Sequence, residues 1–240
     1  MRRLVVIAVV AVAGTLPAPA VAAKVDLLVV GKQDVLRGPA KVRLKERSVK
    51  VGGKRCRVGA ATPLSALAAT GLKLGFRDYG ACGKRPRDAG GLYVTAVAGE
   101  REKGRGGWVY KVGRRVGTTA AADPSGSFGD GKKLRGGQRV TWFWCEQNLS
   151  GGCQRTLEAV PDRTAVAPGE TLSVTVRGYD DQGEGIAVSG VTVTLGSATA
   201  LSGADGVAVL SVPAAPGARK LQAEKDGLVR AFPRKVTIAG

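Results

Sequence analysis

Four cysteines that follow a short apolar leader constrain this chain more than any other feature of its sequence. Residues 1–23 carry two arginines directly after Met1, continue through the apolar stretch Leu4–Ala13, and end on AVAA. This order is typical of a secretory signal peptide, and we expect cleavage after residue 22 or 23. In an exported chain, an even number of cysteines predicts disulfides rather than free thiols.

The spacing of the cysteines suggests how they pair. Cys56, Cys82, Cys145 and Cys153 allow about three pairings. Because neighbours in sequence close the shortest loops, we expect the disulfides Cys56–Cys82 and Cys145–Cys153, which would stabilise the fold by roughly 3.5 and 2.5 kcal/mol. A zinc site made of the four thiolates is the alternative, but the chain has no His and no CxxC pair.

The chain is strongly basic, with a formal net charge of +18 at pH 7. Such a charge favours anionic partners, and we expect an anionic cell-wall polymer, a glycan or a surface protein. The Lys and Arg residues are scattered, which also suits a solvated basic surface. No nucleic-acid-binding motif accompanies the charge, so nucleic acid is not the expected partner. No apolar stretch after the leader is long enough to span a bilayer, so no transmembrane segment is expected after cleavage.

The first part of the mature chain, residues 24–155, mixes strand patterns with one helix pattern. Thr62 followed by Pro63 is typical of a helix start, and Gly71 of its end. The apolar runs 92–98, 107–116 and 139–145 predict strands. The intervening stretch 118–138 is rich in Gly, Ser, Asp and Lys and predicts a long loop. We therefore expect a compact α+β module with one short helix.

The second part, residues 158–240, has a different pattern. Apolar and polar residues alternate, as at Leu172, Val174 and Val176, and turn residues such as Asp205-Gly206 recur between the alternating runs. Several short alternating strands separated by turns predict an immunoglobulin-like β-sandwich. The expected fold class of the whole chain is therefore mainly β.

Four stretches of the first module occur in a familiar order: TPLSALAAT, GLYVTAV, GGWVYKVG and LRGGQRVTWFW. Over residues 60–148 they resemble a bacterial domain family of unknown function related to the C-terminal domain of transcobalamin. The family departs from this chain at Gly137-Gln138, where it has Gly-Asp. The matching positions are Gly107, Trp108, Tyr110, Val112, Gly137, Val140, Trp142 and Trp144.

This resemblance implies a β-grasp-like α+β fold. In transcobalamin the domain caps a vitamin that a separate helical barrel holds, and this chain has no sequence for such a barrel. Binding of cobalamin or another small ligand is therefore an alternative only, and no cofactor is expected. The stretch SGADGVAVLSVPAAPG in the second part resembles bacterial immunoglobulin-like or carboxypeptidase-regulatory-like sandwiches.

Aromatic pairs provide the candidate ligand-binding residues. On a strand, Trp108 and Tyr110 share one face, and so do Trp142 and Trp144. Each pair could form a platform for sugar rings or could anchor the core of a small fold. The residues favour the core, and both interpretations stay open.

Catalytic and metal-binding groups are scarce. Without His, Ser-His and Cys-His nucleophiles are excluded, and the acidic residues near Asp123 and Asp180 are more typical of turns than of a calcium site. We expect no catalytic residue and no metal. The sequence therefore predicts a non-catalytic bacterial protein that is secreted or held at the cell surface, with a binding or adhesion role. A purely structural envelope component and an enzyme of unrecognised type are the alternatives.

Overall fold

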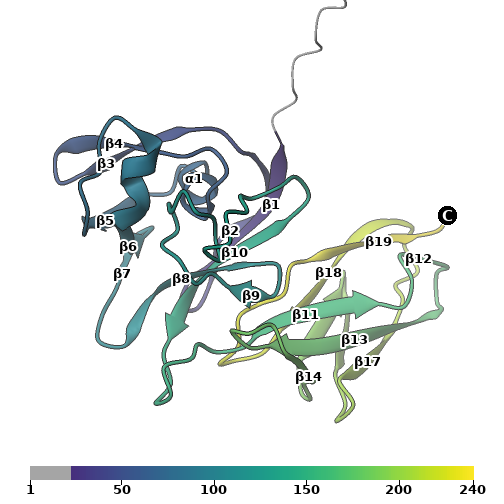
Figure 1. The fold of residues 1–240 in the computed structure, drawn as a ribbon. Coiled ribbons are helices and arrows are strands. Elements are labelled where there is room, and N and C mark those ends of the chain that lie inside the picture. The colour runs from purple at the N-terminus through teal and green to yellow at the C-terminus, as the bar shows by residue number, and fades with distance from the viewer. Residues whose placement is uncertain (1–22) are drawn as a thin grey trace, which may run out of the picture.

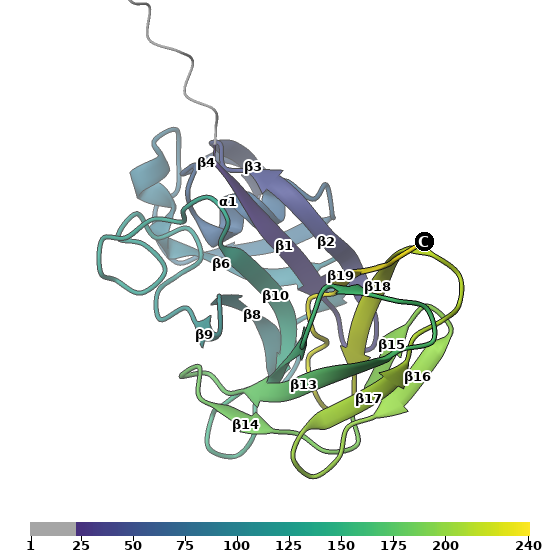
Figure 2. The same cartoon turned by 90° about the vertical axis from the view of Figure 1, so that its right-hand side faces the viewer.

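The computed structural model describes residues 23–240, and Figures 1 and 2 show their fold from two sides. The expected leader lies outside the described residues, except for Ala23. The fold is mainly β, with a small α+β part followed by an immunoglobulin-like sandwich, as the sequence predicts. Within residues 23–240, no helix has the length and apolar character needed to cross a bilayer.

We call the part from β1 to β10 the N-terminal lobe. Its elements are β1 (Lys24–Val30), β2 (Val35–Arg43), β3 (Arg47–Val51), β4 (Lys54–Val58), α1 (Pro63–Ala68), β5 (Leu74–Asp78), the 3-10 helix η1 (Pro86–Gly91), β6 (Leu92–Val97), β7 (Glu100–Arg101), β8 (Gly106–Val112), β9 (Arg115–Val116) and β10 (Arg139–Glu146).

We call the part from β11 to β19 the sandwich. Its strands are β11 (Thr156–Pro161), β12 (Ala165–Val166), β13 (Thr171–Tyr179), β14 (Gly185–Ala187), β15 (Thr192–Leu195), β16 (Ala198–Leu201), β17 (Val207–Ser211), β18 (Gly217–Glu224) and β19 (Arg234–Ile238).

The main sheet of the lobe has the strand order β2-β1-β10-β8-β9. Its two central strands, β1 and β10, come from opposite ends of the lobe and run parallel, whereas the other pairs are antiparallel. The run expected to be one strand over 107–116 is a hairpin, because Gly113 turns the chain with a φ of +63° between β8 and β9. Consecutive side chains of β1 and β10 are buried, so the middle of the sheet is covered on both faces.

Helix α1 packs on one face of this sheet and begins as the sequence predicts. The Thr62 hydroxyl accepts a hydrogen bond from the Ser65 amide at 3.2 Å, and Pro63 occupies the first turn. The helix ends at Ala68, earlier than the expected stop at Gly71. Trp142 on β10 donates from Nε1 to the carbonyl oxygen of Pro63 at 3.1 Å, which ties the helix to the sheet.

The sandwich packs one sheet, in which β13 pairs with β11, β14 and β17, against a second of order β12-β19-β18-β15-β16. Alternation places Leu172, Val174 and Val176 of β13 inward, and all three are fully buried. The sandwich core shares no residue with the core of the lobe. Each part therefore has a hydrophobic core of its own.

Both expected disulfides form. Cys56–Cys82 joins β4 to the loop before η1, and Cys145–Cys153 joins the end of β10 to the segment before β11. The second bridge therefore closes the linker between the lobe and the sandwich.

The second face of the main sheet is covered by the sandwich. Leu28 and Val30 of β1 and Phe143 of β10 point to this side and pack with Val229, which lies between β18 and β19. Figure 2 shows the sandwich strands beside the lower ends of β1 and β10. The alternation of β1 predicts only one buried face; the second is buried by a segment about 200 residues away in the sequence.

Candidate functional site

The structure buries all four aromatic candidates. Trp108, Tyr110, Trp142 and Trp144 are between 1% and 6% exposed. Trp108 and Trp144 face each other edge to face with ring centroids 5.9 Å apart, and Tyr110 lies 5.5 Å from Trp142. The indole of Trp108 donates to the carbonyl oxygen of Glu100 at 2.9 Å, so its polar atom is satisfied inside the fold. None of these rings is an open platform.

The four aromatic residues nevertheless line two different hollows. Trp108, Tyr110 and Trp142 lie at the base of an apolar pocket of about 380 Å³, with the exposed Tyr79 and the half-exposed Tyr93 at its rim. Trp144 instead borders a larger hollow of about 760 Å³ between the lobe and the sandwich. We call the larger hollow the inter-lobe cleft.

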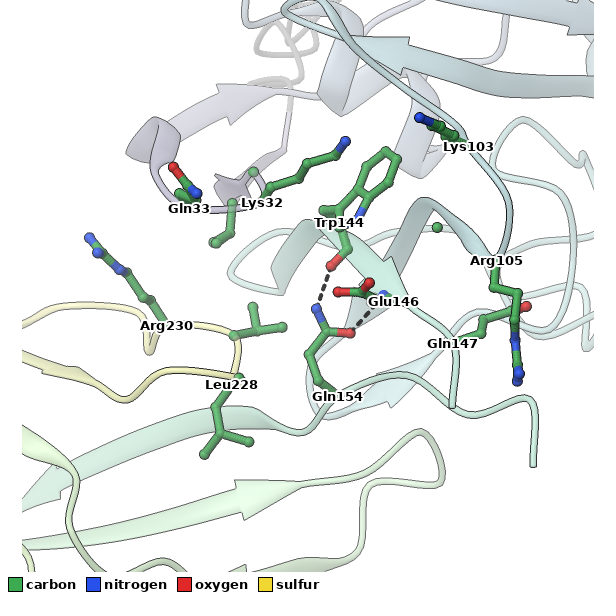
Figure 3. A pocket seen from close by; sticks show the side chains of 15 residues that line it. Lys32, Gln33, Lys103, Arg105, Trp144, Glu146, Gln147, Gln154, Leu228 and Arg230 are labelled. Carbon is green, nitrogen blue, oxygen red and sulfur yellow. Dashed lines mark hydrogen bonds between the residues drawn. The ribbon is translucent and has the colours of Figure 1, made fainter. Parts of the chain in front are cut away.

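Segments far apart in the sequence line the inter-lobe cleft, as Figure 3 shows. The lobe contributes the turn after β1, residues 30–33, the turn before β8, and the end of β10. The sandwich contributes the loop 227–230 between β18 and β19. A ligand in the cleft would therefore touch both parts of the molecule.

The charged lining of the cleft is predominantly basic. Lys32, Lys103, Arg105 and Arg230 border it, against the single carboxylate of Glu146. The Lys32 ammonium lies 4.2 Å from the centroid of the Trp144 ring, a distance typical of a cation–π contact.

One of the four cations, Arg230, is already held by an ion pair. Arg230 pairs with Glu224 at 3.2 Å on the sandwich side. No ion pair holds Lys32, Lys103 or Arg105 within residues 23–240. These three side chains are the ones that an incoming anion can engage without breaking an ion pair.

Close packing fixes the aromatic wall of the cleft. A Cβ atom on Gly106 would collide with the Trp144 ring. On the opposite side, a Cβ on Gly31 would come within 2.5 Å of the Glu100 carboxylate, which accepts the Lys32 amide hydrogen at 3.0 Å. Glycine at these positions lets the Lys32 turn pack against Glu100 and lets the Trp144 ring pack against β8.

The linker between the two parts forms the floor of the cleft. Gln154 donates from Nε2 to the carbonyl oxygen of Trp144 at 2.6 Å and accepts the Glu146 amide hydrogen at 3.0 Å, and Figure 3 shows both bonds. The neighbouring Cys153 amide donates to Asp181 Oδ2 at 2.9 Å. The Cys145–Cys153 disulfide spans the same linker. The floor is thus tied covalently to the lobe and by a hydrogen bond to the sandwich.

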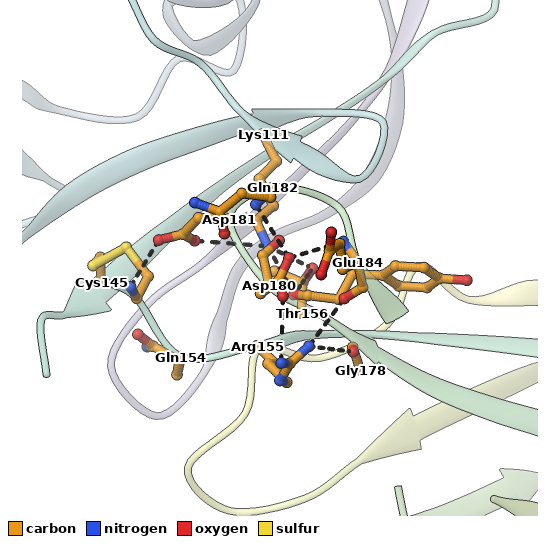
Figure 4. A network of polar contacts seen from close by, with 12 residues as sticks. Lys111, Cys145, Gln154, Arg155, Thr156, Gly178, Asp180, Asp181, Gln182 and Glu184 are labelled. Carbon is orange, nitrogen blue, oxygen red and sulfur yellow. Dashed lines mark hydrogen bonds and ion pairs between the residues drawn. A yellow bond between two sulfur atoms is a disulfide. The ribbon is translucent and has the colours of Figure 1, made fainter. Parts of the chain in front are cut away.

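A buried lysine joins the lobe to the sandwich next to this floor (Figure 4). Lys111 of β8 is 1% exposed, and its ammonium donates to the carbonyl oxygens of Tyr179 and Asp180 at 2.9 and 2.8 Å and to the Thr156 hydroxyl at 3.1 Å. Burial lowers the pKa of Lys111 to about 8, against the opposing charges of Asp181 and Asp180. Asp181 Oδ1, 4.0 Å from the ammonium, has no hydrogen-bond partner among the described residues.

A second polar cluster surrounds Glu158 of β11. Its carboxylate accepts hydrogen bonds from Arg114 at 2.6 Å, Arg139 at 3.3 Å and Arg234 at 2.9 Å, so it joins two lobe arginines to the sandwich. Burial opposes ionisation, but the hydrogen bond from Arg114 and the three positive charges outweigh it and hold the pKa of Glu158 below its ordinary value. Apolar packing and these two polar clusters together fix how the sandwich sits on the lobe.

Sequence reasoning missed the cleft and Lys111. Alternation puts Lys111 on the strand face opposite Trp108 and Tyr110, and nothing local indicates that residues 179–181 cover it. The acidic turns lie where they were expected: Asp180 Oδ1 accepts the amide hydrogens of Gln182 and Glu184, as an Asx turn does. No group of three or more His, Cys, Asp or Glu side chains within residues 23–240 is placed to hold a metal ion.

Comparisons with known proteins add little. No family model and no curated protein matches the sequence, so the likeness to the transcobalamin-related family stays a prediction. Among solved structures, the adhesin FdeC of Escherichia coli aligns with a TM-score of 0.31 and 15% identity, over 94% of this chain and 66% of that one. The D00-D0 domain of Intimin aligns with a TM-score of 0.29 and 13% identity, over 90% and 96%. Scores this low establish neither a common fold nor a common function.

Proposed function

We propose that this chain is an exported, non-catalytic binding protein of the cell surface or the extracellular medium, and that its inter-lobe cleft binds an acidic glycan or a similar anionic cell-wall polymer. The observation that supports this most is the basic lining of the 760 Å³ cleft. Export is supported by the leader pattern and by the two disulfides, which persist in oxidising compartments.

The chemistry of the lining suits an acidic saccharide. Arg105 can bind a carboxylate or a phosphate through two parallel hydrogen bonds, and Lys32 and Lys103 add point charges. The amide side chains of Gln33 and Gln147 also border the cleft and can donate to or accept from sugar hydroxyls. A ligand that drew Lys32 off the Trp144 ring would uncover part of the ring face for a sugar ring to contact.

A cleft made by two parts binds well only if the parts are held in place. Ordering two loose parts on binding would reduce the affinity, whereas a preformed site avoids that loss. Lys111, the Glu158 cluster and the Cys145–Cys153 bridge provide contacts that hold the lobe and the sandwich together. These contacts favour a binding role over that of a flexible spacer.

We propose a non-catalytic role because of the side chains that the chain contains. The chain has no His, and its four cysteines are paired in disulfides. The one strongly perturbed amine, that of Lys111, is buried and donates to three oxygens, so no substrate reaches it.

Calorimetric titration with two matched oligosaccharides tests the proposal. Oligogalacturonate has a carboxylate on each ring, and its methyl ester keeps the rings without the charge. We expect binding of the acid alone, with affinity reduced about tenfold by Lys32→Gln and by Arg105→Gln, each removing one charge-assisted contact of about 1.5 kcal/mol. Lys220→Gln, an exposed residue on β18, is the control.

Three results would count against this function. The first is equal binding of the acid and the ester. The second is an affinity that Lys220→Gln lowers as much as Arg105→Gln. The third is no binding of oligogalacturonate or of a phosphate-bearing polymer at millimolar ligand, which would favour a structural component without a ligand.

A further inference from the structure

The inter-lobe cleft continues past its basic wall into two further hollows. A neighbouring hollow shares Lys103, Arg105 and Gln147 with the cleft, and Figure 3 shows these three side chains together at one side of it. Tyr93 and Val109 line both this neighbouring hollow and the apolar pocket over the core aromatics. Because each hollow shares a wall with the next, the three form one continuous depression, which we call the extended groove.

Two exposed tyrosines lie at the far end of the extended groove. Tyr79 is 68% exposed and Tyr93 is 38% exposed, and their rings meet edge to face with centroids 6.2 Å apart. Within residues 23–240, these two are the only exposed aromatic side chains. Their rings leave apolar area in water that a ligand can cover. We call Tyr79 and Tyr93 the aromatic corner.

The ring of Tyr79 is held in place although it is exposed. Arg77 lies 5.7 Å from the ring centroid and donates to the Tyr79 hydroxyl at 2.8 Å. The Tyr79 amide donates to the carbonyl oxygen of Gly91 at 2.9 Å, and a Cβ on Gly91 would collide with the backbone of Gly80. A ring that is already ordered loses little conformational freedom when a ligand covers it.

The polar groups of the aromatic corner differ from those of the cleft. Arg77 pairs with Glu102 at 3.3 Å, so these two charges offset each other beside the rings. The carboxylate can still accept and the guanidinium can still donate further hydrogen bonds. A sugar suits this arrangement, because its C–H groups can pack on a ring while its hydroxyls bond the polar atoms. Since the charges are balanced, the aromatic corner fits an uncharged sugar better than an acidic one.

Resting on the proposed function of the cleft, we propose that the aromatic corner is a second subsite for the same glycan chain, which places an acidic sugar in the cleft and an uncharged sugar on the corner. Continuity of the extended groove argues for this occupant, because a chain that leaves the cleft past Arg105 follows the groove to Tyr93. Gly106 borders the cleft and Tyr110 the apolar pocket, and four residues of strand cover about 13 Å. An oligosaccharide can span this distance.

This arrangement predicts that affinity depends on the length of the glycan. A chain that contacts both subsites loses its translational freedom only once, so the second contact adds to the affinity of the first. The ligand class is therefore a glycan in which acidic and uncharged sugars alternate.

Calorimetric titration with hyaluronan oligosaccharides, in which glucuronate alternates with N-acetylglucosamine, tests this proposal. A disaccharide occupies the cleft alone, whereas an octasaccharide reaches the aromatic corner. We expect the octasaccharide to bind about tenfold more tightly and Tyr79→Ala to remove this gain, with less than a twofold effect on the disaccharide. Tyr79→Phe retains the ring and should retain the gain. The matched control is Leu201→Ala on β16, which is 66% exposed and should change neither affinity.

Equal affinities for the two lengths, or a gain that Tyr79→Ala leaves intact, would overturn the proposal. An equal loss with Leu201→Ala would overturn it as well. Octagalacturonate carries a charge on every ring, and an equal gain with this chain would contradict the assignment of an uncharged sugar to the corner.

Arg105→Gln distinguishes failure of the second subsite from failure of the proposed function. It should lower the affinity for the disaccharide and for the octasaccharide alike. No effect on either length would refute binding in the cleft. A loss at both lengths, with no effect of Tyr79→Ala on either, would leave the cleft as the binding site and refute the second subsite alone.

Discussion

The free energy of unfolding should depend on pH through the protonation of Lys111, with a sign and a size that follow from the surroundings of this side chain. Burial lowers its pKa from 10.5 to about 8, in spite of Asp180 and Asp181 nearby, and Arg155 lowers it further. In the unfolded chain the pKa returns to its ordinary value. Between the two values the unfolded state binds more protons than the folded state, so the free energy of unfolding rises with pH.

The size of this effect can be worked out from the two pKa values. With an ordinary value of 10.5 and a folded value of about 8, the contribution of Lys111 to stability increases by about 2 kcal/mol between roughly pH 7 and 9.5. The neutral amine of Lys111 still has two N–H groups. It can therefore still donate to the carbonyl oxygens of Tyr179 and Asp180 after it loses its proton.

Urea unfolding of the natural chain and of Lys111→Met, each at both pH values, measures the effect. All other titrating groups are shared, so their contributions cancel in the difference between the two chains. We expect this difference to move by about 2 kcal/mol in favour of the natural chain as the pH rises. A difference that stays constant, or that moves the other way, would refute the reasoning.

Three further changes test the packing around the cleft. Replacing both Cys145 and Cys153 with Ser should lower the free energy of unfolding by roughly 2.5 kcal/mol by loop entropy and weaken ligand binding; unaltered titrations in the cleft would show that the linker does not shape it. Gly106→Ala should displace the Trp144 ring and shift its fluorescence, since the new methyl group overlaps it; an unchanged spectrum would argue against this contact. Glu158→Gln should destabilise the chain by about 1.5 kcal/mol, because three partly exposed arginines lose their shared carboxylate; an unchanged free energy of unfolding would argue against this role of Glu158.

Local patterns in the sequence predicted the elements that local forces determine. Thr62 and Pro63 start a helix through their own backbone geometry, and the alternation in β13 follows from one buried face. The nearest-neighbour pairing of cysteines follows from short loops. Each of these features depends on residues within a few positions, or within one loop, of one another.

The candidate site was not predictable because distant contacts create it. Lys111 looks like an exposed strand residue until residues 179–181 cover it, and the cleft needs Lys32 and Arg230 to meet from opposite ends of the chain. The large apolar area of the aromatic side chains makes them candidates for ligand binding. The same property favours their burial in the core. Trp144 alone among the three tryptophans borders the cleft.

The central claim is that an acidic glycan binds in the inter-lobe cleft. The indole resonances of the three tryptophans test this claim most directly. In a proton–nitrogen correlation spectrum each indole gives one signal, and Trp108 and Trp142 have theirs bonded to carbonyl oxygens in the core. On addition of oligogalacturonate, we expect the Trp144 signal to shift and the other two to stay. A shift of the Trp108 and Trp142 signals without Trp144 would place the ligand in the apolar pocket and contradict the account of the cleft.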